Sequence, residues 1–281
     1  MYTLIDGKKV AGQVLEKIAK EVATLKAAGK TVTLAVIIVG DDPASRVYVN
    51  NKKLDCEKVG IRSLEYALPA DTKQEELMAL IGDLNSRDDV DGILCQLPIP
   101  KHLDEKAVLN AISPKKDVDA FHPENVGHIM LGDFVFLPCT PAGVMELLHA
   151  YNVPIEGKHC VVVGRSNIVG KPMAMLTLKE NATVTLCHSK TRDLPSITRQ
   201  ADILIAAVGI AKFIKADMVK EGAVVIDVGM NRDENGKLCG DVDFDAVAEK
   251  STAITPVPGG VGPMTRAMLL ENTITAAKSR K

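Results

Sequence analysis

Short apolar segments of strand length alternate along this chain with longer segments that have the periodicity of amphipathic helices. That order is typical of parallel sheets covered by helices, because each parallel strand needs a crossover connection to the next. The alternation occurs in two series, with an irregular connector over residues 113–142 between them. A chain of 281 residues has room for two domains of roughly 150 residues each. We therefore expect an α/β fold with two domains.

The first series predicts three strands that alternate with three helices. The expected strands are residues 32–39, 63–68 and 92–96, and the expected helices are residues 10–28, 43–59 and 72–85, the last capped by Thr72. Gln96 ends the third strand, at the carboxyl edge where open α/β sheets bind ligands. On position alone, Gln96 is equally consistent with a cap and with a binding-site residue.

The helix expected over residues 43–59 carries the first candidate site. Its end signals are a cap, a first-turn proline and a glycine just past the end, at Asp42, Pro43 and Gly60. Tyr48 and Lys52 share one face of this helix with Ser45. An aromatic ring beside an amine that exchanges protons suits a site for a planar heterocycle. The spacing alone also allows a solvated lysine beside a half-buried tyrosine.

The second series contains a candidate nucleotide turn, GRSNIVG at residues 164–170, after an expected strand at 159–163. Glycines let the backbone approach a pyrophosphate, and the N–H groups of a helix start attract it. The spacing is G-x5-G and not G-x-G-x-x-G, so an ordinary strand-to-helix turn is the alternative. The other expected elements are helices at 142–151 and 265–279 and strands at 182–187, 203–208 and 223–228.

The residues after the strand at 182–187 indicate which nucleotide binds. An acidic residue there would hold the ribose 2′-hydroxyl of NAD, but the sequence is His188-Ser189-Lys190. Cations and hydroxyls favour the 2′-phosphate of NADP, although an ordinary polar turn is the alternative. The expected cofactor contacts are Gly164, Arg165, Ser166, Ser189 and Met230.

Charge and composition argue against several classes of function. Lys and Arg number 34 and Asp and Glu 36, and aromatic residues make up 3%. We therefore expect no nucleic-acid partner and no membrane partner. The six cysteines lack a C-x-x-C pair, and Asp117, Asp119 and His122 lack further ligands at suitable spacing, so no metal is expected. The absence of a leader pattern and of a membrane-length apolar run predicts a cytoplasmic protein.

Six ordered motifs resemble the bifunctional methylenetetrahydrofolate dehydrogenase/methenyltetrahydrofolate cyclohydrolase family and extend over nearly the whole chain. They are PASRVYVNNK (43–52), DGILCQLPIP (91–100), KDVDAFHP (116–123), PCTPAG (138–143), GRSNIVG (164–170) and TPVPGGVGPMT (255–265). Two positions depart from the family pattern. Ala120 stands where glycine is usual, and Met230 stands where isoleucine is commoner.

The resemblance implies two α/β/α domains flanking a cleft and a homodimer formed through the nucleotide domains. Residues 1–138 would form the folate-binding catalytic domain, with the C-terminal helix 265–281 returning to it, and residues 139–264 would form a Rossmann-like NADP-binding domain. The implied reactions are oxidation of 5,10-methylenetetrahydrofolate with NADP and hydrolysis of the methenyl product to 10-formyltetrahydrofolate. A non-catalytic NADP-binding sensor on the same fold is the alternative.

The resemblance also implies roles for individual residues. Lys52 would carry the proton transfers of hydrolysis, with Gln96 hydrogen-bonded to it, while Tyr48 borders the folate rings and Asp119 binds the pterin. The other implied substrate contacts are Leu97, Pro258, Gly259 and Gly260. A base role for Lys52 requires a pKa well below the ordinary value of about 10.4. A short-chain dehydrogenase is disfavoured, because its Tyr-x-x-x-Lys pair follows the glycine turn in sequence instead of preceding it.

Overall fold

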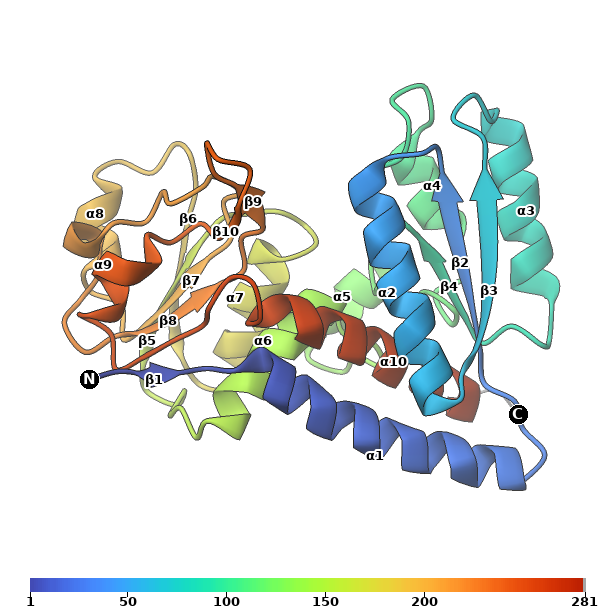
Figure 1. Cartoon of the computed structure of the whole chain (residues 1–281), viewed down its shortest axis with the longest axis horizontal. Coiled ribbons are helices and arrows are strands. Elements are labelled where there is room, and N and C mark those ends of the chain that lie inside the picture. Colours follow the sequence, from blue (N-terminus) through green and yellow to red (C-terminus); the bar gives the residue numbers. More distant parts are fainter. Residues whose placement is uncertain (280–281) are drawn as a thin grey trace. The chain divides into compact units, whose positions relative to one another are not determined.

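A computed structural model describes residues 1–279, apart from the side chain of Ala44. The chain forms two compact units (Figure 1). Residues 1–12 and 140–265 make up the six-stranded unit, and residues 13–139 with the chain from 266 onward make up the three-stranded unit. Three helices continue from one unit into the other: α1 (Gly7–Ala27), α6 (Cys139–Ala150) and α10 (Val261–Ser279).

The three-stranded unit has a parallel sheet in the order β3-β2-β4. Its elements are β2 (Thr33–Val39), α2 (Pro43–Val59), β3 (Arg62–Leu68), α3 (Gln74–Ser86), β4 (Gly92–Cys95), α4 (Glu105–Ala111) and α5 (Pro123–Leu131). All seven residues of β2 are buried. Alternate side chains pack on opposite faces: Leu34, Val36 and Ile38 join one core cluster with α1, α2 and α10, and Ala35, Ile37 and Val39 join another with α3. Helices therefore cover both faces of this sheet.

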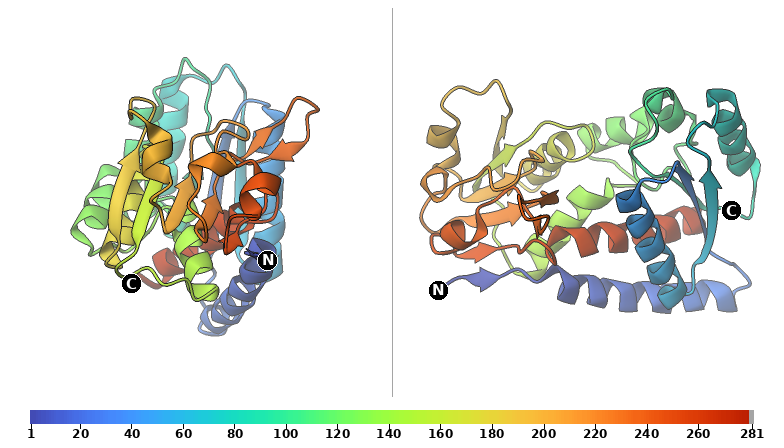
Figure 2. Two further views of the ribbon diagram at one scale, coloured as in Figure 1. Left: turned by 90° about the vertical axis from the view of Figure 1, so that its left-hand side faces the viewer. Right: turned by 45° about the horizontal axis from the view of Figure 1, so that its top comes forward.

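Helices α1 and α10 lie side by side within this unit (Figures 1 and 2). Ile18 on α1 and Ile274 on α10 belong to the same buried cluster. An ion pair joins the two helices, with Lys278 Nζ 2.5 Å from Glu21 Oε2. The return of the C-terminal helix to this unit was expected from the family resemblance.

Helix α2 confirms the prediction for residues 43–59 at both ends. The Asp42 carboxylate accepts a hydrogen bond from the N–H of Ser45, and Pro43 occupies the first turn. Gly60 follows in the left-handed region at φ 82°, and its N–H reaches the carbonyls of Cys56 and Glu57. Because both ends are fixed by local signals, the positions of Tyr48 and Lys52 along the helix are fixed too.

Several expected boundaries are wrong. Helix α3 begins at Gln74 and its N-cap is Lys73, whose N–H is accepted by Glu76; the Thr72 hydroxyl instead donates to the carbonyl of Pro69. The connector expected to be irregular contains α5, with Pro123 in its first turn and Gly132 at φ 79° after its end. Helix α4 was not expected, and α10 begins at 261 and not at 265.

The six-stranded unit has a parallel sheet in the order β1-β11-β8-β7-β5-β6. Its elements are β1 (Thr3–Leu4), β5 (His159–Val163), α7 (Gly170–Lys179), β6 (Thr183–Cys187), α8 (Leu194–Thr198), β7 (Ile203–Ala206), β8 (Val224–Asp227), a hairpin of β9 (Asn231–Arg232) and β10 (Leu238–Cys239), α9 (Phe244–Ala248) and β11 (Ala253–Ile254). The strand order reverses at β5, which has β6 on one side and β7 on the other. Dinucleotides bind at such a switch point in Rossmann-like sheets.

The N-terminal residues lie in a different unit from the one expected. The sequence placed residues 1–12 in the first domain, whereas in the structure they are part of the six-stranded unit. Thr3 and Leu4 pair with Ala253 and Ile254, so β1 extends the edge of the six-stranded sheet. A two-residue strand has no periodicity of its own, and its partner lies about 250 residues away in the chain.

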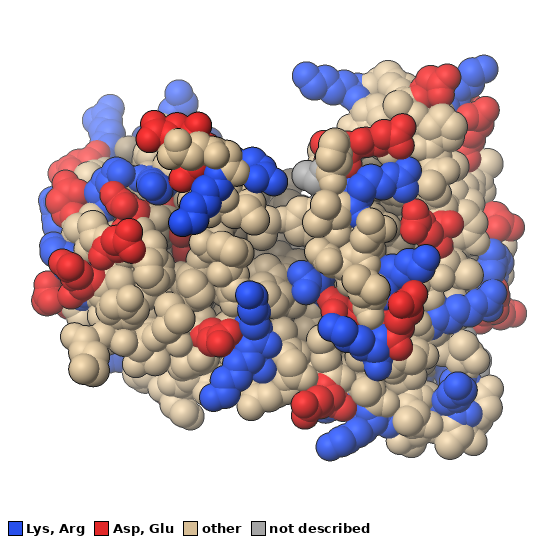
Figure 3. Space-filling model, in the orientation of Figure 1, with Lys and Arg blue, Asp and Glu red and all other residues tan. Residues whose placement is uncertain are grey.

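Basic and acidic side chains are interspersed over the face shown in Figure 3, in keeping with the near balance of 34 Lys and Arg against 36 Asp and Glu. None of the helices within residues 1–279 is long and apolar enough to cross a membrane.

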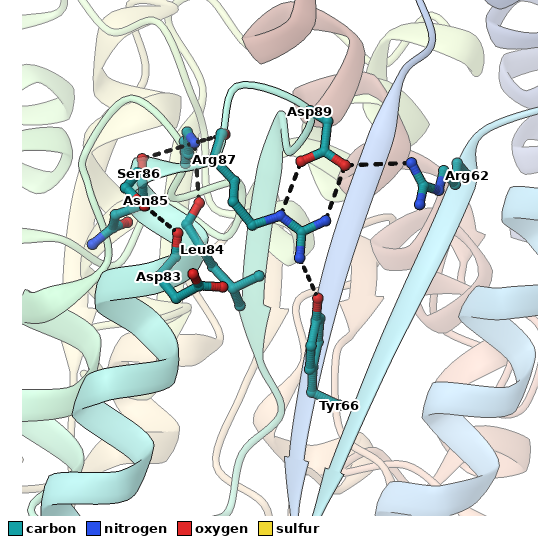
Figure 4. A network of polar contacts seen from close by, with 9 residues as sticks. Arg62, Tyr66, Asp83, Leu84, Asn85, Ser86, Arg87 and Asp89 are labelled. Carbon is teal, nitrogen blue, oxygen red and sulfur yellow. Dashed lines mark hydrogen bonds and ion pairs between the residues drawn. The ribbon is translucent and has the colours of Figure 1, made fainter.

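A polar network closes the C-terminal end of α3 (Figure 4). Arg87 donates from Nε and Nη2 to the two carboxylate oxygens of Asp89, at 2.9 Å each, and from Nη1 to the hydroxyl of Tyr66 at 2.8 Å. Lys116 Nζ donates to the carbonyls of Leu84 at 3.1 Å, Asn85 at 2.9 Å and Arg87 at 2.6 Å. The last carbonyls of a helix have no partner within it, so this ammonium satisfies groups that would otherwise need water.

We expect Lys116→Met to lower the free energy of unfolding by about 2 kcal/mol, because a charge-assisted contact to three carbonyls is lost while the aliphatic stem is kept. Urea denaturation followed by circular dichroism measures the change. Lys115→Met is the matched control, since Lys115 is exposed and precedes Lys116 directly. Equal midpoints for the two variants would contradict the assignment of Lys116 to the helix end.

Candidate active site

Lys52 and Gln96 meet where α2 passes the carboxyl end of β4. Lys52 Nζ donates to Gln96 Oε1 at 2.8 Å. Gln96 follows β4, and its Nε2 donates to the carbonyl of Leu97 at 2.7 Å, so the amide is turned with its oxygen toward the lysine. The hydrogen bond between these two side chains, expected from the family resemblance, is present.

Lys52 has the electrostatic setting that a proton-transfer group needs. Burial lowers the pKa of Lys52 from its ordinary value, and the charge of Asp119 opposes this effect. Burial likewise raises the pKa of the Asp119 carboxyl, while Lys52 lowers it. The two groups therefore favour each other's charged form, while burial favours the neutral form of each.

The segment that carries Asp119 is fixed by contacts from later parts of the chain. Asp119 Oδ1 accepts a hydrogen bond from Cys139 Sγ at 3.3 Å. Asn272 on α10 donates to the carbonyls of Val118 and Leu137, at 2.8 Å each. The Asp119 carboxylate is thus held beside Lys52 by groups from α6 and α10.

Ala120 has a left-handed backbone, with φ 57°, and its side chain is fully buried. Glycine adopts this region freely, whereas an alanine there costs about 1 kcal/mol. The glycine that the family usually has at this position is explained by this conformation, which the chain keeps although Ala120 carries a Cβ.

Asp117 stabilises the fold of the same segment. Its Oδ2 accepts from the N–H of His122 at 2.7 Å and from Asn125 Nδ2 at 2.9 Å. Burial raises the pKa of Asp117 to about 6. His122 in turn caps α5, with Nδ1 accepting from the N–H of Glu124. Within residues 1–279, no three His, Cys, Asp or Glu side chains gather as a metal site.

The candidate nucleotide turn lies at the switch point of the six-stranded sheet, between β5 and α7. Gly164 has φ 128°, and a Cβ there would meet the carbonyl oxygen of Ala207 at 2.1 Å. A Cβ on Gly170 would meet the carbonyl oxygen of Gly164 at 1.9 Å. Ser166 Oγ accepts from the N–H groups of Val169 and Gly170, so it shapes the start of α7. Both glycines are therefore required for the turn to close on itself.

The other expected cofactor contacts are exposed and come from neighbouring segments of the same unit. Arg165 and Ser189 are exposed at the ends of β5 and β6, and Lys190 follows with its N–H bonded to His188 Nδ1 at 3.1 Å. Met230 is 43% exposed and lies between β8 and β9. A cation and a hydroxyl after β6 suit a 2′-phosphate, as the sequence predicts.

Two buried aspartates, which the sequence analysis missed, organise the segments around Met230. Asp241 is fully buried, and its carboxylate accepts from the N–H groups of Val208 at 2.6 Å and of Gly209 and Ile210 at 3.0 Å each, and from Asn231 Nδ2 at 2.8 Å. Asp227, at the end of β8, accepts from the N–H groups of Gly229, Asp241 and Val242, at 2.9 Å each. Burial raises the pKa of Asp227 to about 7, against the effect of these N–H donors.

Pro258, Gly259 and Gly260 belong to the six-stranded unit, in a loop packed against the start of α1. The carbonyl of Gly259 accepts from the N–H of Lys8 at 3.1 Å. A Cβ on Gly7 would meet the carbonyl oxygen of Gly260 at 1.8 Å, so the loop and the helix start approach closely. Leu97 directly follows Gln96, which bonds to Lys52, and belongs to the three-stranded unit. The contacts of these residues with folate stay predictions.

Asp55 and Arg266 form a charged contact that the sequence analysis also missed. Arg266 Nε donates to Asp55 Oδ2 at 2.7 Å, across 211 residues of sequence. A signal for Asp55 was available, because it follows Tyr48 by seven residues and Lys52 by three and so shares their helical face. Arg266 has no comparable signal, since only the packing of α10 on this unit places it there.

These features define a class of protein. A lysine with a lowered pKa, held by an amide at the carboxyl end of a parallel sheet, is joined in one chain to a Rossmann-like unit with a glycine turn at its switch point. That combination defines a two-unit α/β nucleotide-dependent enzyme in which the lysine of lowered pKa lies outside the nucleotide unit.

Comparisons with known proteins identify the family. Residues 5–119 match the model of the tetrahydrofolate dehydrogenase/cyclohydrolase catalytic domain, and residues 138–281 match that of the tetrahydrofolate dehydrogenase/cyclohydrolase NAD(P)-binding domain. The chain is 60% identical over 278 residues to the bifunctional protein FolD of Lachnoclostridium phytofermentans, with 99% of each chain covered. It belongs to the tetrahydrofolate dehydrogenase/cyclohydrolase family.

Solved structures agree with this assignment. The bifunctional enzyme FolD, methylenetetrahydrofolate dehydrogenase/cyclohydrolase, from Campylobacter jejuni is 53% identical, with a TM-score of 0.98 and 100% of both chains covered. The N5,N10-methylenetetrahydrofolate dehydrogenase-cyclohydrolase of Trypanosoma brucei, complexed with NADP cofactor and an inhibitor, is 40% identical, with a TM-score of 0.95 and coverage of 99% of this chain and 98% of that one.

Proposed function

We propose that this chain oxidises 5,10-methylenetetrahydrofolate with NADP and hydrolyses the 5,10-methenyl product to 10-formyltetrahydrofolate. The observation that carries the proposal is Lys52, whose Nζ is held by Gln96 at 2.8 Å and whose pKa is lowered by burial. A dehydrogenase alone does not need such a group, because the cation that hydride loss leaves is shared by two nitrogens. A basic side chain is needed when water adds.

The residues of this chain fit NADP. A Cβ on Gly164 or on Gly170 would collide with backbone atoms, so both positions require glycine, the residue that lets the backbone of a nucleotide turn come close to a phosphate. Arg165, Ser189 and Lys190 would hold the 2′-phosphate. When bound, NADP supplies the acceptor for the hydride. The chain's own contribution to that step is orientation, through Tyr48 beside the folate rings and Asp119 as the acceptor for the N–H edge of the pterin.

In the hydrolytic step, Lys52 acts first as a base and then as an acid. The neutral amine takes one proton from water as the oxygen bonds to the methenyl carbon. The resulting ammonium gives a proton to the ring nitrogen as its bond to that carbon breaks, and the hydroxyl of the adduct releases its remaining proton to solvent as the formyl C=O forms. Gln96 Oε1 accepts one N–H of the amine and so fixes where its lone pair points. A cationic substrate lowers the pKa of Lys52 further, which favours the neutral form when the substrate is bound.

We expect the purified protein to form NADPH and the methenyl compound from methylenetetrahydrofolate and NADP, and then to consume the methenyl compound faster than a blank without protein. Absorbance spectroscopy follows both steps, and a parallel assay with NAD tests the cofactor preference. NADP binding without any turnover would overturn the proposal and favour the non-catalytic sensor.

Two further parts of the proposal concern the assembly and the compartment. We infer a homodimer from the family resemblance, and light scattering of the purified protein tests it. A reducing, cytoplasmic location is supported by the six cysteines, all of which carry free thiols.

A further inference from the structure

A charged pair that the hydrolytic mechanism does not use is attached to the helix that carries Lys52. Asp55 lies on α2 three residues after Lys52, and only 7% of its side chain is exposed. Arg266, near the start of the part of α10 that belongs to this unit, donates to it from Nε at 2.7 Å. A buried carboxylate left without a partner is costly, so this contact fixes the position of the guanidinium.

The contact lies on the face of α2 that forms the site. Tyr48, Lys52 and Asp55 follow each other at spacings of four and three residues, which places them in one stripe. Arg266 reaches that stripe from α10, and its charge acts on Tyr48 and Lys52. It opposes the effect of burial on the pKa of Tyr48 and adds to the effect of burial on the pKa of Lys52.

The charged and titratable groups around Lys52 act in opposite directions. Three groups raise the pKa of Lys52: Asp119 in the loop before α5, Cys139 at the start of α6 and Cys56 on α2. Arg266 lowers it from α10. Asp119, the proposed acceptor for the pterin, has a negative charge that favours the protonated form of Lys52, and the positive charge of Arg266 offsets this effect.

We propose that Arg266 is a positioning residue for hydrolysis: anchored by Asp55, its guanidinium keeps a larger share of Lys52 neutral and ready to accept the proton of water. The inference rests on the proposed function, because it assigns a consequence to the basicity of Lys52. It adds a residue of α10 to the determinants of the hydrolytic rate and leaves the hydride step, which moves no proton, without a requirement for this charge.

The test is the pH profile of methenyl hydrolysis, corrected for the reaction without protein. In Arg266→Gln we expect the pH at which kcat/KM reaches half its maximum to move upward by about half a pH unit or more, since a nearby positive charge that lowered the pKa of Lys52 is gone. Arg266→Lys keeps the charge and should keep the wild-type profile. The dehydrogenase kcat should change little in either variant.

Lys58→Gln is the matched control. Lys58 Nζ lies 3.7 Å from Oδ1 of the same Asp55, but its side chain is 70% exposed. Removing this screened charge should leave the pH profile unchanged. If Arg266→Gln does not fold, the double variant Arg266→Gln/Asp55→Asn replaces it, because it leaves no buried carboxylate unpaired. In this double variant we expect a smaller upward shift of the pH at which kcat/KM reaches half its maximum.

A wild-type pH profile in Arg266→Gln would overturn the inference. So would an equal shift in Arg266→Lys or in Lys58→Gln, because the effect would then not follow the charge of Arg266. Failure of the proposed function has a different signature, namely no hydrolysis by the wild-type protein. In that case, the pH dependence of Lys52 labelling by an amine reagent, read by mass spectrometry, compares the wild type with the variant without any need for activity.

Discussion

Lys52→Met is expected to reduce the rate of methenyl hydrolysis by about 10²- to 10⁴-fold, the range that a positioned proton-transfer group supplies. The aliphatic part of methionine is close in length to that of lysine, so packing along α2 is largely kept while the amine is lost. The hydrogen bond to Gln96 Oε1 at 2.8 Å disappears with it.

In Lys52→Met, the Kd for NADP should stay within about twofold of the wild-type value, because the nucleotide turn and the segments after β6 and β8 belong to the other compact unit. Lys53→Met is the matched control: Lys53 is the next residue on α2 and is exposed. Stopped-flow or steady-state hydrolysis of the methenyl compound and fluorescence titration with NADP provide the two readouts. Hydrolysis at the wild-type rate in Lys52→Met would refute the role assigned to this lysine.

Elements with local end signals could be predicted from the sequence. Helix α2 begins and ends where Asp42, Pro43 and Gly60 indicate, because caps, first-turn prolines and left-handed glycines act on their own helix. Helix α5 has the same kind of signals in Pro123 and Gly132, although it lies in the connector that the sequence analysis predicts to be irregular. The information for α5 was present, and its short length of nine residues weakened the periodic pattern.

Features that depend on distant parts of the chain were out of reach. Strand β1 exists only because β11 offers an edge to it, and Arg266 reaches Asp55 across 211 residues. The candidate site illustrates both cases. Tyr48 and Lys52 follow from helical spacing, whereas the hydrogen bond from Cys139 to Asp119 needs the packing of α6 against a loop. The family resemblance supplied Gln96 and Asp119 as site residues, which spacing alone left open.

The buried carboxylate of Asp241 leads to the second large expected effect. Three consecutive backbone N–H groups, those of Val208, Gly209 and Ile210, donate to it, together with Asn231 Nδ2. These donors cannot bond to each other. Since each buried donor without a partner costs about 1–3 kcal/mol, and water entering the space left by the carboxylate would satisfy some of them, Asp241→Ala should lower the free energy of unfolding by about 3–5 kcal/mol.

Cofactor binding should weaken together with stability in Asp241→Ala, because this carboxylate joins the turn after β7 to Asn231, the residue next to Met230. Both segments lie after strands at the carboxyl edge of the six-stranded sheet, where a nucleotide binds. We expect the Kd for NADP to rise about tenfold or more at temperatures where the variant is still folded, and thermal denaturation followed by circular dichroism defines that range. Asp245→Ala, which removes an exposed carboxylate in the first turn of α9, is the control and should change stability by about 0.5 kcal/mol or less. A variant of Asp241 with the stability of the control and the NADP affinity of the wild type would show that the three N–H groups are satisfied without the carboxylate.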